Sequence, residues 1–279
     1  MTFGSNLAAA FETQGRLCVG IDPHAWLLDR WELPVSAAGA REFGLRVVDA
    51  AAGRAPLLKP QVSFFERWGS AGFTALERVL AEARDADLLV IGDAKRGDIG
   101  STMDAYATAW LTPGSPLEVD ALTVNPYLGL GSLLGAAELA RTHGKGLFVL
   151  AATSNPEAAG LQQARRTDVN ASVAASMLAG VAAWNQTDET VGSFGVVIGA
   201  TLSLADFAIP SDEPSRPVVP ILAPGFGEQG AQVSDVQRIF GALAPGVIVS
   251  ESRSLLERGP EQLADAIERR RDEIAAQHG

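Results

Sequence analysis

Short apolar runs recur along the whole chain, and each is followed by a turn or by a segment with helical periodicity. Eight of these runs read as strands, and several are apolar at both odd and even positions, as in strands covered on both faces. This pattern predicts a parallel α/β sheet. The predicted strands are Leu17–Asp22, Pro56–Val62, Leu88–Lys95, Ala121–Asn125, Gly146–Thr153, Gly195–Ala200, Val218–Pro224 and Gly246–Ser250.

Segments with helical periodicity lie between the strands, and they predict helices over Ala38–Ala52, Phe65–Ala86, Thr102–Leu111, Ser132–Thr142, Ala171–Trp184, Val233–Leu243 and Glu261–Gln277. Residues 205–217 are rich in proline and charge, so we expect that connection to be irregular. Eight strand–helix units predict a closed (β/α)₈ TIM barrel, a single domain over residues 1–279 with its chemistry at the carboxyl ends of the strands. An open doubly wound sheet is the alternative.

The composition narrows the class of protein and of partner. Of the 279 residues, 47% are hydrophobic, which excludes global disorder. The 22 Lys and Arg against 33 Asp and Glu give a net charge of −11, which argues against nucleic acid or an anionic membrane surface as a partner. The one cysteine, Cys18, excludes an intrachain disulfide. Because neither a secretory signal nor an apolar run of membrane-spanning length is visible, we expect a cytoplasmic protein.

The strongest local motif is Asp93–Asp98 (DAKRGD), at the end of a strongly apolar strand. Alternation along a strand places Asp93 and Lys95 on one face, which would be the inward face of a barrel. Asp98 follows where the chain has left the strand, so it can curl back over the barrel mouth or reach a neighbour. Charges on an apolar inner face are costly unless they are paired, so a purely structural Asp–Lys ion pair is the alternative to a catalytic one.

Two other predicted strand ends carry charge. Asp22 ends the first strand before a proline, and Lys59 lies in the second strand. Taken singly, Asp22 reads equally well as a turn residue and Lys59 as a rim lysine. Together with the Asp93–Asp98 motif they would place carboxylates and ammonium groups around one barrel mouth, where each keeps its neighbour ionised. Such an array suits proton delivery to a carbanion.

A glycine-rich loop, Gly225–Gly230 (GFGEQG), matches the dinucleotide-binding fingerprint, and Glu251 stands at the matching distance beyond it. Too little chain follows for a Rossmann domain. A phosphate site between the last two strand ends is the better interpretation, because Glu251–Leu256 reads as the short extra helix and Arg253 can grip a phosphate. An ordinary turn with a surface arginine is the alternative.

The segment Ala152–Pro156 (ATSNP) follows the predicted fifth strand. Its small polar side chains can hydrogen-bond a flat polar ligand, but they also cap helices and build turns. The three histidines show no metal-ligand spacing, and no serine lies in a Gly-x-Ser-x-Gly elbow. Metal and nucleophilic catalysis therefore have no support in the sequence.

The chain resembles the orotidine 5′-phosphate decarboxylases, specifically the branch found in mycobacteria and related bacteria. The segments that carry the resemblance stand in family order over nearly the whole chain and are Val19–Pro23, Lys59–Glu66, Asp93–Thr102, Pro126–Gly129, Ala152–Pro156 and Pro224–Gly227. The resemblance implies a (β/α)₈ barrel that uses no cofactor and no metal and takes a small-molecule substrate. It also implies a homodimer that shares its active sites.

The resemblance further implies a role for each matching residue. Lys95 would be the proton donor, flanked by Asp93 and Asp98, with Lys59 completing the charged array. The substrate-binding residues would be Asp22 on the ribose, Ser154 on the pyrimidine, Arg253, Gly225 and Gln229 around the phosphate, and Ile99 and Thr102, which with Asp98 would serve the partner subunit. Two alternatives stay open: a related barrel sugar-phosphate decarboxylase that needs a divalent metal, and a non-catalytic nucleotide-binding barrel.

Overall fold

Parallel strands close into a barrel in the computed structural model, which describes residues 1–186 and 190–278. The barrel strands are β1 (Leu17–Ile21), β2 (Leu57–Pro60), β3 (Leu89–Arg96), β4 (Ala121–Val124), β5 (Gly146–Ala152), β8 (Phe194–Ile198), β9 (Ile221–Pro224) and β10 (Val247–Glu251). Strand β1 pairs with β2 on one side and with β10 on the other, so the sheet has no open edge. The predicted (β/α)₈ barrel is confirmed, and the open sheet is wrong.

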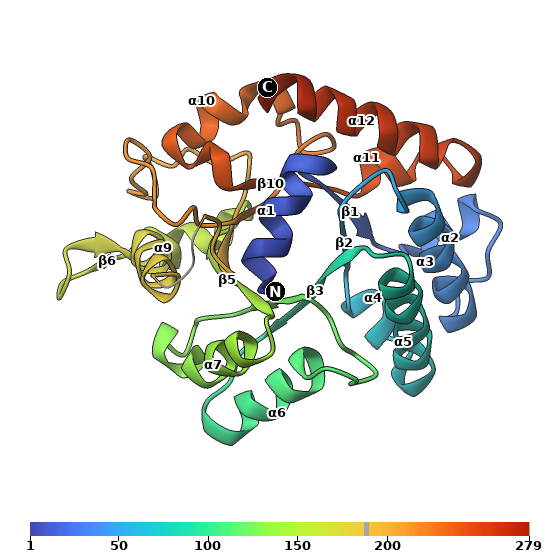
Figure 1. Cartoon of the computed structure of the whole chain (residues 1–279), viewed down its shortest axis with the longest axis horizontal. Coiled ribbons are helices and arrows are strands. Elements are labelled where there is room, and N and C mark those ends of the chain that lie inside the picture. The colour runs from blue at the N-terminus through green and yellow to red at the C-terminus, as the bar shows by residue number, and fades with distance from the viewer. Residues whose placement is uncertain (187–189, 279) are drawn as a thin grey trace.

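The barrel interior is filled by one apolar side chain from each strand, and these are Cys18, Leu57, Ile91, Ala121, Phe148, Val197, Leu222 and Ile248. Helix α1 (Phe3–Thr13), which the sequence reasoning missed, adds Phe3 and Leu7 to this cluster. The Phe3 ring meets Phe148 edge to face, with 6.0 Å between the ring centroids. Figure 1 shows α1 lying across the barrel. Because Phe148 is near the start of β5, α1 covers the amino ends of the strands and leaves the carboxyl ends open for a site.

The outer faces of the strands pack against a ring of helices (Figure 1). Its main members are α3 (Ala37–Ala51), α5 (Gly69–Asp85), α6 (Gly100–Leu111), α7 (Leu134–Thr142), α9 (Val173–Trp184), α10 (Val236–Phe240) and α12 (Leu263–His278). Each of these helices begins within a few residues of the start of a predicted helix. The irregular connection expected over residues 205–217 contains no helix or strand, which confirms that prediction.

Three predicted helices are interrupted. The helix expected over Phe65–Ala86 is divided into α4 (Ser63–Glu66) and α5, because Gly69 takes a left-handed conformation (φ 60°). The helix expected over Val233–Leu243 consists of η3 (Val233–Asp235), α10 and η4 (Gly241–Gly246), and Gly241 (φ 53°) ends α10 in the same way. The helix expected from Ser132 starts as the 3₁₀ turn η1 (Leu130–Leu133) before α7.

Short elements on the connections were not predicted. They are α2 (Ala25–Arg30), η2 (Pro156–Ala158), α8 (Ala159–Gln162) and the hairpin of β6 (Arg165–Arg166) with β7 (Ala171–Ser172), while the turn η5 (Pro260–Gln262) overlaps the start of the helix expected over Glu261–Gln277. The hairpin extends away from the barrel (Figure 1) and takes the first residues of the helix expected from Ala171. Over residues 1–186 and 190–278, none of the helices combines the length and apolarity needed to cross a bilayer.

Candidate active site

Two lysines and one aspartate meet at the carboxyl ends of β2 and β3. Lys59 lies two residues beyond Leu57 and so shares its inward face. Its Nζ donates to Asp93 Oδ2 at 2.8 Å, while Lys95 Nζ donates to Asp93 Oδ1 at 2.5 Å. One carboxylate therefore holds two ammonium groups, one on each oxygen.

The surroundings keep Lys59 and Asp93 ionised. Burial by itself would raise the pKa of Asp93, but the attraction of Lys59 and Lys95 outweighs it and holds that pKa well below its ordinary value. Burial would likewise lower the pKa of Lys59, and the nearby carboxylates of Asp93 and Asp22 raise it instead. The two ammonium groups differ in access, since the Lys59 side chain is 10% exposed and the Lys95 side chain 45%. Lys95 is the cation that a bound molecule can reach.

A buried threonine completes this cluster. Thr123, in β4, donates its hydroxyl to Asp93 Oδ1 at 2.9 Å and accepts from the backbone N–H of Lys95 at 3.0 Å. Sequence reasoning missed Thr123, because a threonine inside a strand gives no chemical signal of its own. Its distance from Asp93 along the chain hides a contact that the pairing of β3 with β4 creates.

Asp22 lies just beyond the end of β1, as expected. Its Oδ1 is buried and has no hydrogen-bond partner among the described residues. A buried carboxylate oxygen without a donor is costly, so this atom is suited to receive a hydroxyl from a bound molecule. Asp22 also contributes to the field that raises the pKa of Lys59, which places the two groups near each other.

Asp98, Ile99 and Thr102 lie after β3 and at the start of α6, outside the cluster of their own chain. The Asp98 carboxylate accepts from the backbone N–H of Ile99 at 2.8 Å, and the ion pair of Lys95 among the described residues is with Asp93 instead. The Ile99 side chain is largely exposed, and Thr102 is exposed as well. Asp98 therefore lies outside the charged cluster of its own chain, whereas Lys59 is part of that cluster.

The loops after β9 and β10 touch one another. Gly225 (φ 115°) and Gly227 (φ 72°) take conformations that favour glycine, and a Cβ added at Gly227 would lie 2.8 Å from Ser254 Cβ. Ser254 belongs to α11 (Arg253–Leu256), the short helix that the sequence predicted here. Arg253, its first residue, lies 3.5 Å from the carboxylate of Glu228 in the glycine loop, so this exposed ion pair joins the loop to α11.

Glu251 is not free to bind a dinucleotide. It is buried, accepts from Arg270 Nε at 2.5 Å and from the Ser254 hydroxyl at 2.8 Å, and thereby ties β10 to α12 and α11. The dinucleotide interpretation of the glycine loop is therefore wrong, because its acidic residue is used for packing inside the barrel wall.

A cavity of about 280 Å³ opens above the Lys59–Asp93–Lys95 cluster, and we call it the catalytic cavity. Its lining residues are Lys59, Gln61, Asp93, Lys95, Thr123, Leu150, Thr153, Ser154, Asn155, Val197, Leu222, Pro224 and Gln229. Two residues predicted for binding, Ser154 and Gln229, therefore face the same space as the charged cluster. Gly225 adjoins it, since a Cβ there would lie 3.2 Å from Gln229 Oε1.

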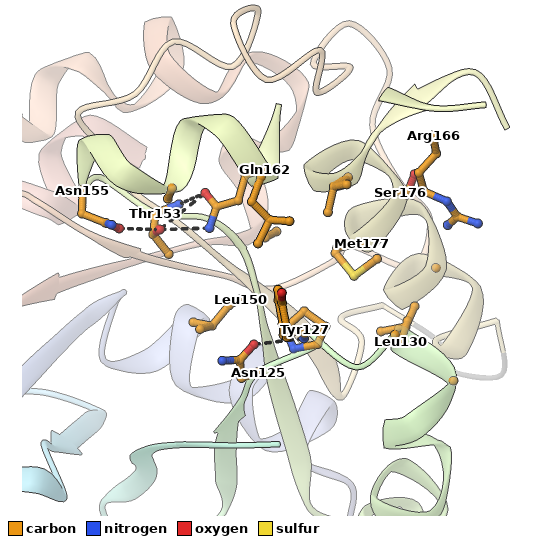
Figure 2. A pocket seen from close by; sticks show the side chains of 18 residues that line it. Asn125, Tyr127, Leu130, Leu150, Thr153, Asn155, Gln162, Arg166, Ser176 and Met177 are labelled. Atoms are coloured by element: carbon orange, nitrogen blue, oxygen red, sulfur yellow. Dashed lines mark hydrogen bonds between the residues drawn. The ribbon is translucent and has the colours of Figure 1, made fainter. Parts of the chain in front are cut away.

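A larger cavity of about 730 Å³ lies alongside and shares Leu150, Thr153 and Asn155 with the catalytic cavity. Figure 2 shows its walls, in which apolar side chains such as Met177 and Leu130 predominate. It contains none of the charged cluster. Of these two cavities, the smaller one is therefore the one onto which the charged cluster opens.

The wall between the two cavities is held by hydrogen bonds (Figure 2). Gln162, in α8, accepts from the backbone N–H of Thr153 at 2.8 Å and donates to its hydroxyl at 3.0 Å. The Thr153 hydroxyl lies 2.8 Å from Asn155 Oδ1. Ser154 stands between these two anchored residues, so its position at the catalytic cavity is fixed from both sides.

A closed parallel barrel that holds an ionised Lys–Asp–Lys cluster at its strand ends has the fold and the site of a (β/α)₈-barrel enzyme. Among the described residues, no group of three or more His, Cys, Asp or Glu is arranged to hold a metal ion. The chain belongs to the orotidine 5′-phosphate decarboxylase / HUMPS family, whose model matches residues 15–262.

Relatives of similar length support this membership. The chain is 52% identical over 265 residues to an orotidine 5′-phosphate decarboxylase of Streptomyces coelicolor, covering 94% of this chain and 92% of the relative. It is 49% identical to that of a Nocardioides species, covering 98% of both chains. Among solved structures, the Leishmania donovani OMP decarboxylase is similar with a TM-score of 0.77 and 28% identity, covering 99% of this chain and 98% of that one.

Proposed function

We propose that this protein is an orotidine 5′-phosphate decarboxylase, a carboxy-lyase of pyrimidine biosynthesis that converts orotidine 5′-phosphate (OMP) to uridine 5′-phosphate and CO₂ without a cofactor. The observation that carries the proposal is the Lys59–Asp93–Lys95 cluster at the floor of the catalytic cavity. Membership of the family and relatives about half identical to this chain, which carry that name, support it.

The reaction breaks the bond from C6 of the pyrimidine to its carboxylate, and the electron pair stays on C6. A positive charge beside C6 stabilises that carbanion. Two unit charges about 4 Å apart attract by about 4 kcal/mol at an effective dielectric of 20, which corresponds to roughly a thousandfold in rate. We assign this charge to Lys95, the exposed member of the cluster. Its Nζ then passes a proton to C6 and regains one from water.

Lys59 and Asp93 prepare Lys95 for this role. Asp93 holds the Lys95 ammonium at 2.5 Å, and Lys59 occupies the other carboxylate oxygen. Because Lys59 is almost fully buried, we assign it to maintaining the ionised state of Asp93 rather than to proton transfer. The preorganised cluster needs little rearrangement when charge develops on the substrate.

The rest of the substrate extends toward the glycine loop. We assign Ser154 to the pyrimidine edge, the unpartnered Asp22 carboxylate oxygen to a ribose hydroxyl, and Arg253 with Gly225 and Gln229 to the phosphate. In this scheme Arg253 exchanges Glu228 for the phosphate when substrate binds. Phosphate binding far from C6 can then be used to order the loops around the reacting carbon.

A second copy of the chain completes the site in this proposal. Asp98, Ile99 and Thr102 do not face their own catalytic cavity, and Ile99 is 62% exposed. Further exposed apolar side chains, Tyr106 in α6 and Leu134 in α7, lie on two helices that contact each other. A homodimer built on this face would cover the apolar side chains and bring Asp98 to the partner's cavity.

The direct test is the loss of OMP absorbance on adding purified protein that has been treated with a chelator. We expect turnover by the wild type, none by Lys95→Ala, and wild-type turnover by Arg78→Ala, which removes an exposed cation from α5 instead. A folded Lys95→Ala protein with near-normal turnover would contradict the assignment. Activity only on a keto-sugar phosphate, lost with EDTA, would identify the metal-dependent sugar-phosphate decarboxylase. Binding of the nucleotide without turnover would identify a non-catalytic nucleotide-binding barrel.

A further inference from the structure

The backbone at Lys95 is left-handed, with φ at 47°. A residue with a long side chain adopts this region at a cost, so neighbouring groups have to hold it there. The conformation also explains how Lys95 comes to face Asp93. Strand β3 is not regular at this point, and the simple alternation of side chains does not apply to it.

The irregularity is a bulge in β3 opposite a single residue of β4. Gly92 pairs with Leu122 and Arg96 pairs with Val124, so the three residues Asp93 to Lys95 stand opposite Thr123 alone. A bulge removes backbone groups from the ladder and re-aims side chains. The N–H of Lys95 is one such group, and the Thr123 hydroxyl accepts it at 3.0 Å.

The same hydroxyl has one proton to donate, and two acceptors lie near it. Asp93 Oδ1 is at 2.9 Å and the Gly92 carbonyl oxygen at 3.5 Å, so both distance and charge favour Asp93. Asp93 Oδ1 then accepts hydrogen bonds from the Thr123 hydroxyl and from Lys95 Nζ, while Oδ2 accepts one from Lys59 Nζ. The hydroxyl thus shares Oδ1 with Lys95 and leaves Oδ2 to Lys59, which holds the carboxylate in one orientation.

We propose that Thr123 is a positioning residue for the decarboxylation, since its buried hydroxyl fixes both the backbone of Lys95 and the carboxylate of Asp93. The inference rests on the proposed function and adds the group that aims the proton donor. Thr123 acts through its neighbours, because its hydroxyl bonds only with the Lys95 backbone, the Asp93 carboxylate and the Gly92 carbonyl among the described residues.

The test compares Thr123→Val, which keeps the shape and removes the hydroxyl, with Thr123→Ser, which keeps the hydroxyl. Wild-type turnover of OMP is measured first, so failure of the proposed function would be visible separately. We expect kcat of Thr123→Val to fall about 10- to 100-fold, the range for a lost buried hydrogen bond to a charged group, with KM within about threefold. Thr123→Ser should stay within about threefold of the wild type in kcat.

Folding of each variant is checked by circular dichroism and by its Tm. Thr123→Ala is the second variant without a hydroxyl, and it replaces Thr123→Val in the comparison if the Thr123→Val protein does not fold. Dissociation constants for uridine 5′-phosphate should agree among all variants. The inference would be overturned if the variants without a hydroxyl kept the wild-type kcat, or if Thr123→Ser and Thr123→Val lost kcat equally. A rise in KM with kcat unchanged would also overturn it.

Discussion

Asp93 keeps a full negative charge inside the barrel because two ammonium groups and a hydroxyl surround it. Without them, burial would favour the neutral acid. The ion pair with Lys59 is nearly dry, whereas the pair with Lys95 is open to a ligand on one side. The buried pair of Lys59 with Asp93 thus contributes to stability, while the open side of Lys95 is available for the proposed chemistry.

Asp93→Asn tests the stability side of this cluster. The pKa of Asp93 is lowered in the folded state from an ordinary 3.8, so its contribution is present above about pH 4 and is lost as the pH falls. At pH 7 the variant should lose about 3–5 kcal/mol, because Lys59 stays buried without its partner. Urea unfolding between pH 5 and 3 should show a steeper decline for the wild type than for Asp93→Asn. Parallel declines would contradict the ionised state of Asp93.

The sequence predicted this cluster in part. Alternation placed Lys59 correctly, because β2 is regular at that point. It also brought Asp93 and Lys95 together, although the structure does so through a bulge and a left-handed residue. Thr123 could not be predicted, since a bulge depends on the partner strand and leaves no mark in residue spacing.

The paired loops after β9 and β10 form the next level of organisation. The glycine loop packs on the start of α11, and Glu251 fixes the strand that precedes α11 to α12 through Arg270. The position of Arg253 therefore depends on contacts between three elements. The sequence predicted the short helix, and the phosphate site beside it stays a prediction, while the use of Glu251 as a packing anchor required knowledge of α12.

Gly227→Ala tests this arrangement against Gly230→Ala. Both glycines have positive φ, but a Cβ at Gly227 would meet Ser254 at 2.8 Å, whereas one at Gly230 has nothing within 4 Å. Both variants should lose about 1–3 kcal/mol of stability from backbone strain. Only Gly227→Ala should displace α11 with Arg253, and we expect its KM for OMP to rise about tenfold or more. Equal KM values in steady-state assays would contradict the coupling.

Helix interruptions were the main errors at the level of elements. The apolar pattern continued through Phe65–Ala86, but the left-handed backbone of Gly69 breaks the helix, and α5 then packs so close to α4 that a Cβ at Gly72 would lie 1.8 Å from the Phe65 carbonyl oxygen. Helix α1 was missed for a different reason. Its apolar face is used to close the amino end of the barrel, a role that the eight-unit pattern does not require.

The whole molecule is acidic, with a net charge of −11, yet the proposed substrate is an anion. The structure resolves this contrast, because Lys59 and Lys95 meet at the catalytic cavity and Arg253 stands beside the glycine loop. Net charge describes the surface and says little about a site of this size. The barrel as a whole could be predicted because short apolar runs alternate with segments of helical periodicity along the chain.

Subunit complementation tests the proposed dimer. Lys95→Ala and Asp98→Ala proteins should each be inactive, because every site would use Lys95 of one subunit and Asp98 of the other. After random exchange, half of the dimers are mixed and each has one intact site, so about a quarter of all sites should recover activity. If verified subunit exchange restored no activity, Asp98 would belong to the site of its own subunit.

The most direct test of the account is the fate of C6 in deuterated water. Chelator-treated protein is incubated with OMP in D₂O, and the product is followed by proton NMR. If Lys95, whose protons exchange with solvent, protonates the carbanion, then uridine 5′-phosphate should carry deuterium at C6 and the H6 signal should be missing. Unchanged OMP, or product formed equally well by folded Lys95→Ala, would contradict the account.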